Sequence, residues 1–422
     1  MPPLPLAGVR ILDLTMFMAG PVGTKLLADM GAEVIKVESP GHPDPIRIQA
    51  RGVYPQGEPG ERPWNRSGMI NERARNKLGI TLDLACPEGK AVFLRLVACS
   101  DVVMENYRAD VMENLGLGYA ALRQANPGII LVSIASQGVV GPEALYRSYG
   151  NNLEDLAGMT LLKGYEDEEH PYLVSGAYPD PTSGFLGAGV VVAALRYRRL
   201  NGVGMHVDFS QREMATAMVG DLFMDYAMNR RQPPRWGNGH PWMAPHGCYP
   251  CQGRDKWVTI AVATDAQWQR LCAAIGRPDL ARDERFATGE RRWQNRKALD
   301  AVLTEWTLQR EHVEAMAALQ QAGLAAGAVY NVAELFADPH LEHRGFFEVT
   351  EDPDAGLHRY QGRPWKLSKT PLGTRTPAPL FGQHNQQVLG GLVGLDEPEL
   401  QELEVKGVIG TIPQPRIPVE MT

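Results

Sequence analysis

Hydrophobic positions along the chain fall into short apolar runs separated by longer amphipathic stretches. The runs at residues 9–14 and 33–38 predict strands, and the stretch between them predicts a helix that starts at Pro21 and closes at Gly31. A strand, a helix and a second strand joined by short connections are typical of a parallel sheet with covering helices. The pattern therefore predicts an α/β fold.

The same alternation continues through the first half of the chain. Further strands are expected at residues 79–84, 101–105, 128–135 and 202–208, and helices at 87–99, 151–157 and 210–228. Residues 39–66 are polar and rich in proline, which predicts a long loop. No GxGxxG follows the first strand, so the pattern gives no support to an ordinary dinucleotide site.

The pattern changes after residue 229. Prolines and glycines between residues 230 and 242 predict a linker. One strand at 256–262 and helices at 266–276, 296–307 and 310–322 then predict a smaller α+β unit. Strand-like pieces follow residue 340, and Gly382 opens a last short helix that runs to Val388. At 422 residues, two domains are the expected number.

The composition limits which partners and which cell compartment are expected for the chain. The net charge is −7, which gives no electrostatic argument for binding nucleic acid or an anionic membrane. No apolar run has the length of a membrane span and the first residues lack the pattern of a leader, so we expect a cytoplasmic protein. Five cysteines suit a reducing compartment, and the pair Cys248 and Cys251 is expected to be structural. His246, His340, His343 and His384 have no metal-ligand spacing with nearby carboxylates, so no metal is expected.

The most informative stretch is residues 175–184, where Asp180 stands between two prolines. The apolar run that follows, residues 185–195, predicts a buried helix with Thr182 or Ser183 as its N-cap. Asp180 would then lie at the positive end of that helix, where a carboxylate is stabilised and can act as a nucleophile. Backbone N–H groups near Gly184 would be candidate oxyanion donors. The alternative is a turn aspartate that only caps the helix.

Two further stretches suggest contacts with a phosphorylated ligand. Arg73, Arg75 and Lys77 precede a predicted strand and could hold phosphate, although a solvated charged loop has the same composition. The loop after the strand at 101–105 carries Tyr107 beside Arg108, a pair that could stack an adenine and hold phosphate.

Ordered matches along nearly the whole chain make it resemble the family III CoA-transferases, a superfamily that includes carnitine CoA-transferase, formyl-CoA transferase and α-methylacyl-CoA racemase. The matching segments are Arg10-Ile-Leu-Asp-Leu-Thr, Ala19-Gly-Pro, Leu27-Ala-Asp-Met-Gly-Ala-Glu-Val-Ile-Lys-Val-Glu, Asn76-Lys, Leu82-Asp-Leu, Asp101-Val-Val-Met-Glu-Asn-Tyr-Arg, Leu115-Gly-Leu, Asn126-Pro, Gly141-Pro, Arg344-Gly and Gly382-Gln-His-Asn.

The resemblance implies a Rossmann-like large domain with an inserted smaller α+β domain, and an interlocked dimer. The large domain would comprise residues 1–229 and 341–422, and the linker and small domain residues 230–340. The resemblance also implies that Asp180 is the nucleophile and that coenzyme A enters as a thioester substrate. The implied contacts with CoA come from Phe17, Met18, Ala19, Arg75, Asn76, Lys77, Asn106, Tyr107 and Arg108.

Several features depart from the family pattern. Ser39 and Asn114 stand where some transferases carry arginine, and the glycine-rich loop of formyl-CoA transferase has no clear copy. The racemase branch uses a histidine about thirty residues before the aspartate, whereas residues 148–152 contain none. Tyr149 in that stretch is a poor base at neutral pH. The departures disfavour a formyl or oxalate substrate and leave racemisation without one of its two bases.

The segment Tyr178-Pro-Asp-Pro, with residues 149–158 before it, looks most like the branch that acts on aromatic succinates such as benzylsuccinate, with succinyl-CoA as donor. Met16, Phe17 and Met18 would give an apolar wall suited to a bulky carboxylic acid acceptor. Some members of that branch work as two different subunits, so the chain is expected to form a homodimer or a heterodimer with a homologue. The alternatives are an acyl-CoA racemase or epimerase, and a CoA-binding subunit without catalysis of its own.

Overall fold

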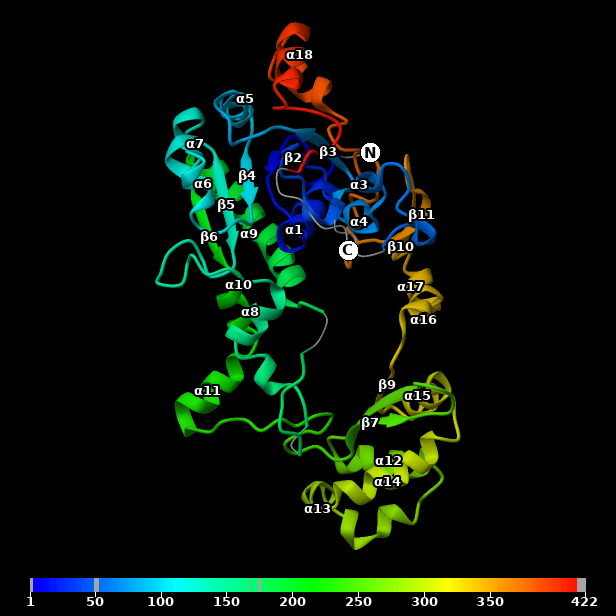
Figure 1. Cartoon of the computed structure of the whole chain (residues 1–422). Coiled ribbons are helices and arrows are strands. Elements are labelled where there is room, and N and C mark those ends of the chain that lie inside the picture. The colour runs from blue at the N-terminus through cyan, green and yellow to red at the C-terminus, as the bar shows by residue number, and fades with distance from the viewer. Residues whose placement is uncertain (1–2, 49–52, 166, 174–175, 416–422) are drawn as a thin grey trace. The chain divides into compact units, whose positions relative to one another are not determined.

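The computed structural model describes residues 3–48, 53–165, 167–173 and 176–415. The chain divides into two compact units (Figure 1). The first, here called the sheet unit, comprises Met1–Met159, Val174–Asp221 and Glu342–Thr422. The second, the small unit, comprises Thr160–Leu173 and Leu222–Leu341. The three candidate stretches that the sequence singled out, around Asp180, Arg75 and Tyr107, all belong to the sheet unit.

The sheet unit is built on six parallel strands, which confirms the predicted α/β class. They are β1 (Arg10–Asp13), β2 (Glu33–Glu38), β3 (Lys77–Thr81), β4 (Val102–Glu105), β5 (Ile130–Ala135) and β6 (His206–Ser210). Their order in the sheet is β3-β2-β1-β4-β5-β6, the order of Rossmann-type sheets. The strand order therefore reverses between β1 and β4, and a ligand crevice is expected at the carboxyl ends of these strands.

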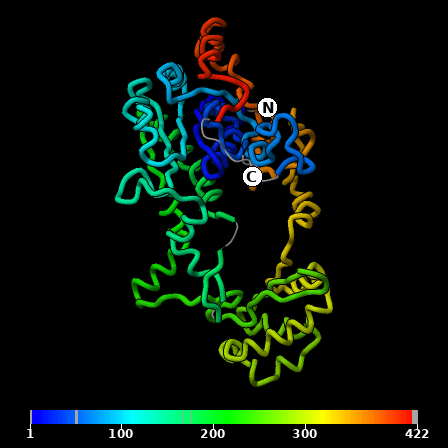
Figure 2. Tube along the Cα trace, viewed as in Figure 1, coloured from blue at the N-terminus to red at the C-terminus, as the bar shows by residue number. Residues whose placement is uncertain are grey.

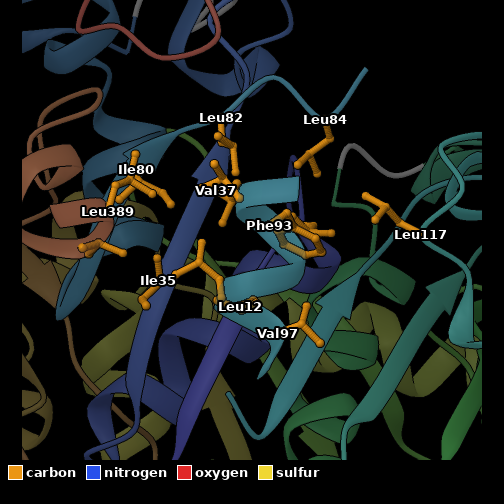
Figure 3. Close-up of a cluster of buried hydrophobic side chains, with 14 of the residues drawn as sticks. Leu12, Ile35, Val37, Ile80, Leu82, Leu84, Phe93, Val97, Leu117 and Leu389 are labelled. Atoms are coloured by element: carbon orange, nitrogen blue, oxygen red, sulfur yellow. The ribbon is translucent and has the colours of Figure 1, made fainter. Parts of the chain in front are cut away.

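One face of this sheet is covered by α5 (Pro87–Ala98) and by the C-terminal part of the chain. Phe93 of α5 and Leu389 of the C-terminal part contact the same buried cluster as Leu12 of β1 (Figure 3). In the Cα trace, the orange and red C-terminal segments lie beside the blue N-terminal ones (Figure 2). The two ends of the chain therefore share one hydrophobic core.

The other face is covered by α1 (Ala19–Asp29) and α9 (Pro179–Asn201), which pack closely against each other. The contact depends on glycine: a Cβ at Gly184 would lie 2.5 Å from the carbonyl oxygen of Ala19. Likewise, a Cβ at Gly23 would lie 2.8 Å from the carbonyl oxygen of Gly184. Because neither site has room for a side chain, this contact fixes how far the start of α9 lies from the start of α1.

The small unit has an antiparallel sheet of β7 (His246–Pro250), β8 (Trp257–Ala261) and β9 (Ala325–Ala328). Helices α12 (Asp265–Ala274), α14 (Arg296–Thr307) and α15 (His312–Gln321) pack on it around buried Trp268 and Phe286. Cys248 lies on β7, and Cys251 follows it in the core with a free thiol. The described residues contain no cluster of His, Cys, Asp or Glu suited to a metal ion.

Shorter elements complete the chain. The helices are α2 (Pro45–Ile48), α3 (Pro63–Arg66), α4 (Gly68–Ala74), α6 (Val111–Asn114), α7 (Tyr119–Ala125), α8 (Gly150–Leu156), α10 (Gln211–Ala217), α11 (Gly220–Asn229), α13 (Gly289–Gln294), α16 (Val332–Phe336), α17 (Pro339–His343) and α18 (Glu397–Val405). Strands β10 (Phe347–Asp352) and β11 (Gly356–Gln361) form a hairpin. Among the described residues, no helix combines the length and apolar character that crossing a membrane requires.

Several predicted elements differ from the structure. The first helix begins at Ala19, two residues before Pro21, and the strand predicted at 202–208 is β6, which begins at His206. The loop at 39–66 contains α2 and α3, and the helix at 210–228 is two helices that meet near Gly220, a weak helix former. The strand predicted at 79–84 is β3, which begins two residues earlier, at Lys77, and ends at Thr81. The last helix, predicted at 382–388, is a π-helical turn at Gln386–Gly390.

The most important difference concerns α9. The helix begins at Pro179, so neither Thr182 nor Ser183 is its N-cap. Proline suits the first helical position because it has no N–H that needs a partner and its φ is already helical. The helix is also not buried all round, because Phe185 is 41% and Leu186 49% exposed.

Gly184→Ala tests the packing of α9 on α1. We expect the added methyl group to lower the free energy of unfolding by about 1–3 kcal/mol, because backbone atoms of α1 must move. Gly189→Ala, on an open face of the same helix with no atom near the place that its Cβ would occupy, is the matched control and should be neutral or slightly stabilising. Equal thermal unfolding of both variants would contradict the packing account.

Candidate active site

Asp180 is the second residue of α9, in the first turn of the helix. Its carboxylate lies against the start of α8, where a Cβ on Gly150 would be 2.8 Å from Oδ2. No hydrogen-bond donor among the described residues binds this carboxylate; the backbone N–H of Asp180 donates to the carbonyl of Ala177 at 3.1 Å. Both oxygens are therefore available to a ligand.

The charge of Asp180 is set by its surroundings. Burial raises the pKa of Asp180 to about 6; the positive charge of Arg73 opposes the rise and the negative charge of Glu154 adds to it. Glu154 is buried on α8 and accepts a hydrogen bond from the backbone N–H of Tyr178 at 3.1 Å. At neutral pH Asp180 is mainly ionised and only half-buried, which suits a nucleophile.

The loop between β1 and α1 lies beside this carboxylate. Phe17 has a φ of 62°, a left-handed conformation that non-glycine residues rarely adopt. Its ring meets the ring of Tyr149 edge to face at 5.8 Å, and Tyr149 directly precedes Gly150. The structure thus brings Phe17 of the first loop and Asp180 of α9 to the same end of the sheet.

Side chains from other strand ends hold that loop. The Asn106 side chain accepts a hydrogen bond from the backbone N–H of Met16 at 2.7 Å and donates one to its carbonyl at 2.9 Å. The backbone N–H of Phe17 donates to Oδ1 of Asp44 at 3.1 Å, and Lys36 pairs with Asp44 at 3.0 Å. The strained backbone at Phe17 is therefore fixed by its neighbours.

Arg75, Asn76 and Lys77 are placed differently. Arg75 is 2% exposed and pairs with Asp29 at 2.7 Å, and Asn76 donates to the same carboxylate at 2.7 Å. Lys77 is fully buried and pairs with Asp13 at 2.9 Å. Burial lowers the pKa of Lys77 to about 8, against the effect of Asp13, so the pair is charged at neutral pH. These side chains join β3 to α1 and β1, and their contact with CoA stays a prediction.

A pocket of about 210 Å³ opens at the carboxyl ends of β1 to β4. Its walls are mainly apolar, with Met16, Leu84, Tyr107 and Leu115 among them. Ser39 and His42 also line it. Arg108, from the same loop as Tyr107, is about a third exposed and forms an ion pair with Asp110 at 2.6 Å. The pocket therefore brings together the loops after four different strands, as the strand order predicts.

Sequence reasoning missed three features of the site. The family resemblance points to residues 148–152, but nothing in the sequence identifies Gly150 and Glu154 as neighbours of the Asp180 carboxylate, and His42 stands in a stretch expected to be loop. The proposed oxyanion donors near Gly184 are wrong, because this residue is in the interior of α9, where N–H groups bind carbonyls of the same helix. In the first turn of α1 the N–H of Val22 donates to the carbonyl of Met18 at 3.0 Å and Pro21 has no N–H. The N–H groups of Ala19 and Gly20, which have no partner among the described residues, are better candidates.

Asn106→Ala tests how the loop is held. We expect a loss of about 1–3 kcal/mol in the free energy of unfolding, because the partly buried N–H and carbonyl of Met16 lose their partners. Asn114→Ala, which removes one exposed bond to Asp110, is the control and should change little. A denaturant titration compares the two, and equal stability would show that the Asn106 bonds do not hold the loop.

Comparison with known proteins gives a consistent result. The family model described as CoA-transferase family III matches residues 6–385. A succinyl-CoA–D-citramalate CoA-transferase of Chloroflexus aurantiacus is 36% identical, over 97% of this chain and 99% of its own. A succinate–glutarate CoA-transferase of Agrobacterium fabrum is 32% identical, over 92% of this chain and 96% of its own. The crystal structure of a CAIB/BAIF family protein from Brucella suis matches with a TM-score of 0.82 at 31% identity, over 92% of this chain and all of that one.

Proposed function

The chain belongs to CoA-transferase family III, and from this premise we propose that it moves CoA from succinyl-CoA to a dicarboxylic acid through a thioester on Asp180. The observation that carries the proposal is the Asp180 carboxylate, half-buried and without a hydrogen-bond donor among the described residues, beside the loop after β1. The substrate class is taken from relatives whose names pair succinyl-CoA with D-citramalate or mesaconate, and succinate with glutarate. Aromatic succinates fall within the same class of acceptor.

In the first half-reaction an oxygen of Asp180 attacks the thioester carbonyl of succinyl-CoA. A C–O bond forms and the C–S bond breaks, which leaves a mixed anhydride and CoA thiolate. The thiolate then attacks the Asp180 carbonyl and releases succinate, so the enzyme holds CoA as an aspartyl thioester. The energy of the thioester is kept, provided that water is excluded.

In the second half-reaction the acceptor carboxylate attacks the aspartyl thioester and CoA thiolate leaves again. The thiolate then attacks the acceptor carbonyl of the new anhydride, which releases the acceptor thioester and regenerates the Asp180 carboxylate. Each carbonyl passes through a tetrahedral oxyanion. The N–H groups of Ala19 and Gly20 at the start of α1 would stabilise it, since a helix N-terminus favours negative charge.

The nucleotide part of CoA would occupy the pocket at the strand ends. Its apolar walls with Tyr107 suit a flat base, and the switch point of a Rossmann-type sheet is where nucleotides bind. Phe17, Met18 and Ala19 would then line the path from this pocket to Asp180. Arg108, about a third exposed, would exchange its pairing with Asp110 for a phosphate.

A dimer is part of the proposal. Apolar side chains are exposed on α9 and α11, with Phe185, Leu186, Phe223 and Met224 each more than 40% exposed. A second copy of the chain or a homologous subunit would cover them. The interlocked arrangement is taken from the family resemblance.

Asp180→Asn tests the nucleophile. We expect CoA transfer to fall below detection while the fold is kept, because an amide oxygen cannot displace the thiolate. Intact-mass spectrometry after mixing the native chain with succinyl-CoA should show a CoA-sized adduct, and hydroxylamine should convert it to a hydroxamate on the Asp180 peptide. Asp279→Asn, an exposed carboxylate in the small unit, is the matched control and should keep both signals.

The remaining outcomes separate the alternatives. Near-normal turnover by Asp180→Asn would contradict the proposal. Deuterium uptake into a chiral acyl-CoA without an adduct would indicate a racemase, with proton transfer in place of acyl transfer.

The activity should depend on pH through Asp180. Only the ionised carboxylate attacks, so kcat/KM for succinyl-CoA should be flat above a pKa of about 6 and fall about tenfold for each pH unit below it. Glu154→Gln removes a negative charge that raises this pKa, so the acid limb should move to lower pH. If the acid limb of the pH profile of Glu154→Gln coincides with that of the native chain, a group other than Asp180 controls the reaction.

A further inference from the structure

Glu105, the last residue of β4, carries a buried carboxyl group that the mechanism has not used. The residue is 3% exposed, and its Oε2 accepts a hydrogen bond from the backbone N–H of Tyr107 at 2.6 Å. No cation among the described residues forms an ion pair with it. Because a buried carboxyl group is costly without donors, the bond from the Tyr107 N–H is strongly favoured.

The other polar groups around Glu105 come from β5 and β6. Ser133 is its partner in the register of β4 and β5, and Oγ of Ser133 is 3.0 Å from Nε2 of His206. Burial raises the pKa of Glu105 to about 7, and the negative charge of Asp208 adds to the rise. The Ser133 hydroxyl and the Tyr107 N–H oppose it. Ionised and neutral forms therefore coexist near neutral pH, and each has an oxygen that can accept from Tyr107.

The residues that follow Glu105 shape the pocket at the strand ends. Asn106 binds the N–H and the carbonyl of Met16, so it joins the loop after β4 to the loop after β1. Met16 and Tyr107 both line the pocket, whereas Glu105 does not. The direction in which the chain leaves β4 decides where Asn106 and Tyr107 stand. The short bond between Glu105 and the Tyr107 N–H fixes this direction from behind the pocket wall.

We propose that Glu105 is a positioning residue for CoA, whose side-chain oxygen holds the loop after β4 in the shape that binds the nucleotide. The inference rests on the proposed function and adds a residue that acts on CoA without touching it. The loop needs the oxygen and not the negative charge, since the donor is a single neutral N–H. Loss of the oxygen should weaken CoA binding and spare the chemical steps, because the packing of α9 on α1 sets the place of Asp180.

The test compares two substitutions at this position. Free CoA is titrated into the chain by calorimetry at pH 8, and kcat is measured with saturating succinyl-CoA and glutarate. Glu105→Leu leaves the Tyr107 N–H without an acceptor, so the Kd for CoA should rise about fivefold to tenfold while kcat changes less than about twofold. Glu105→Gln keeps an oxygen at the same place, and its Kd should stay within about threefold of the native value.

Deuterium exchange of the Tyr107 amide is measured in the same variants. It should be faster in Glu105→Leu and close to native in Glu105→Gln, because the exchange reports the bond itself. Glu404→Leu is the matched control, since it removes an exposed carboxylate from α18 and should change neither the Kd nor the exchange.

Three results would overturn the inference. They are a native Kd in Glu105→Leu, a Kd in Glu105→Gln as high as in Glu105→Leu, and a raised Kd in either variant without faster exchange of the Tyr107 amide. If Glu105→Leu does not fold, Glu105→Gln decides, since it must keep both the protected amide and the affinity. A native chain that binds no CoA would instead contradict the proposed function.

Discussion

The close contact between α1 and α9 is the constraint on which the candidate site depends. Gly23 and Gly184 let the two helix backbones meet where any side chain would separate them. Asp180 is one turn before Gly184, so its position is set by this contact and by Gly150, which leaves space for its carboxylate. The nucleophile is thus held by the packing of a rigid helix, while the loop that faces it is held by side chains of other strands.

Buried polar and charged side chains fix the loop between β1 and α1, as the glycine contact fixes the start of α9. Asp44 accepts from the N–H of Phe17 and pairs with Lys36, and Asn106 binds the backbone of Met16 on both sides. Such fixed polar groups cost stability if they lose their partners, and so they specify one arrangement of the loop. Asp180 is the exception, because its carboxylate has no such partner among the described residues and its pKa is raised by burial.

Much of the fold could be predicted from the sequence because the signals are local. The apolar run at residues 33–38 is β2, and the strands and helices around it alternate as predicted. The sequence predicts Thr182 or Ser183 as the N-cap of α9, whereas the helix begins at Pro179. A hydroxyl N-cap and a proline at the first helical position are both start signals, and the sequence alone does not rank them. The neighbours of Asp180 depend on packing between distant segments, so the contacts of Gly150 and Glu154 with the first turn of α9 could not be found from sequence. The buried ion pairs of Arg75 and Lys77 could not be told from exposed cations for the same reason.

The most direct test of the central claim follows oxygen through a single turnover. The enzyme that carries CoA as a thioester on Asp180 is mixed with glutarate that has heavy oxygen in its carboxylates. The Asp180 peptide is then analysed by mass spectrometry. Because the thiolate cleaves the anhydride on the acceptor side, one heavy oxygen should remain on Asp180 when glutaryl-CoA leaves. Formation of glutaryl-CoA at the normal rate with no label on Asp180 would contradict the covalent account.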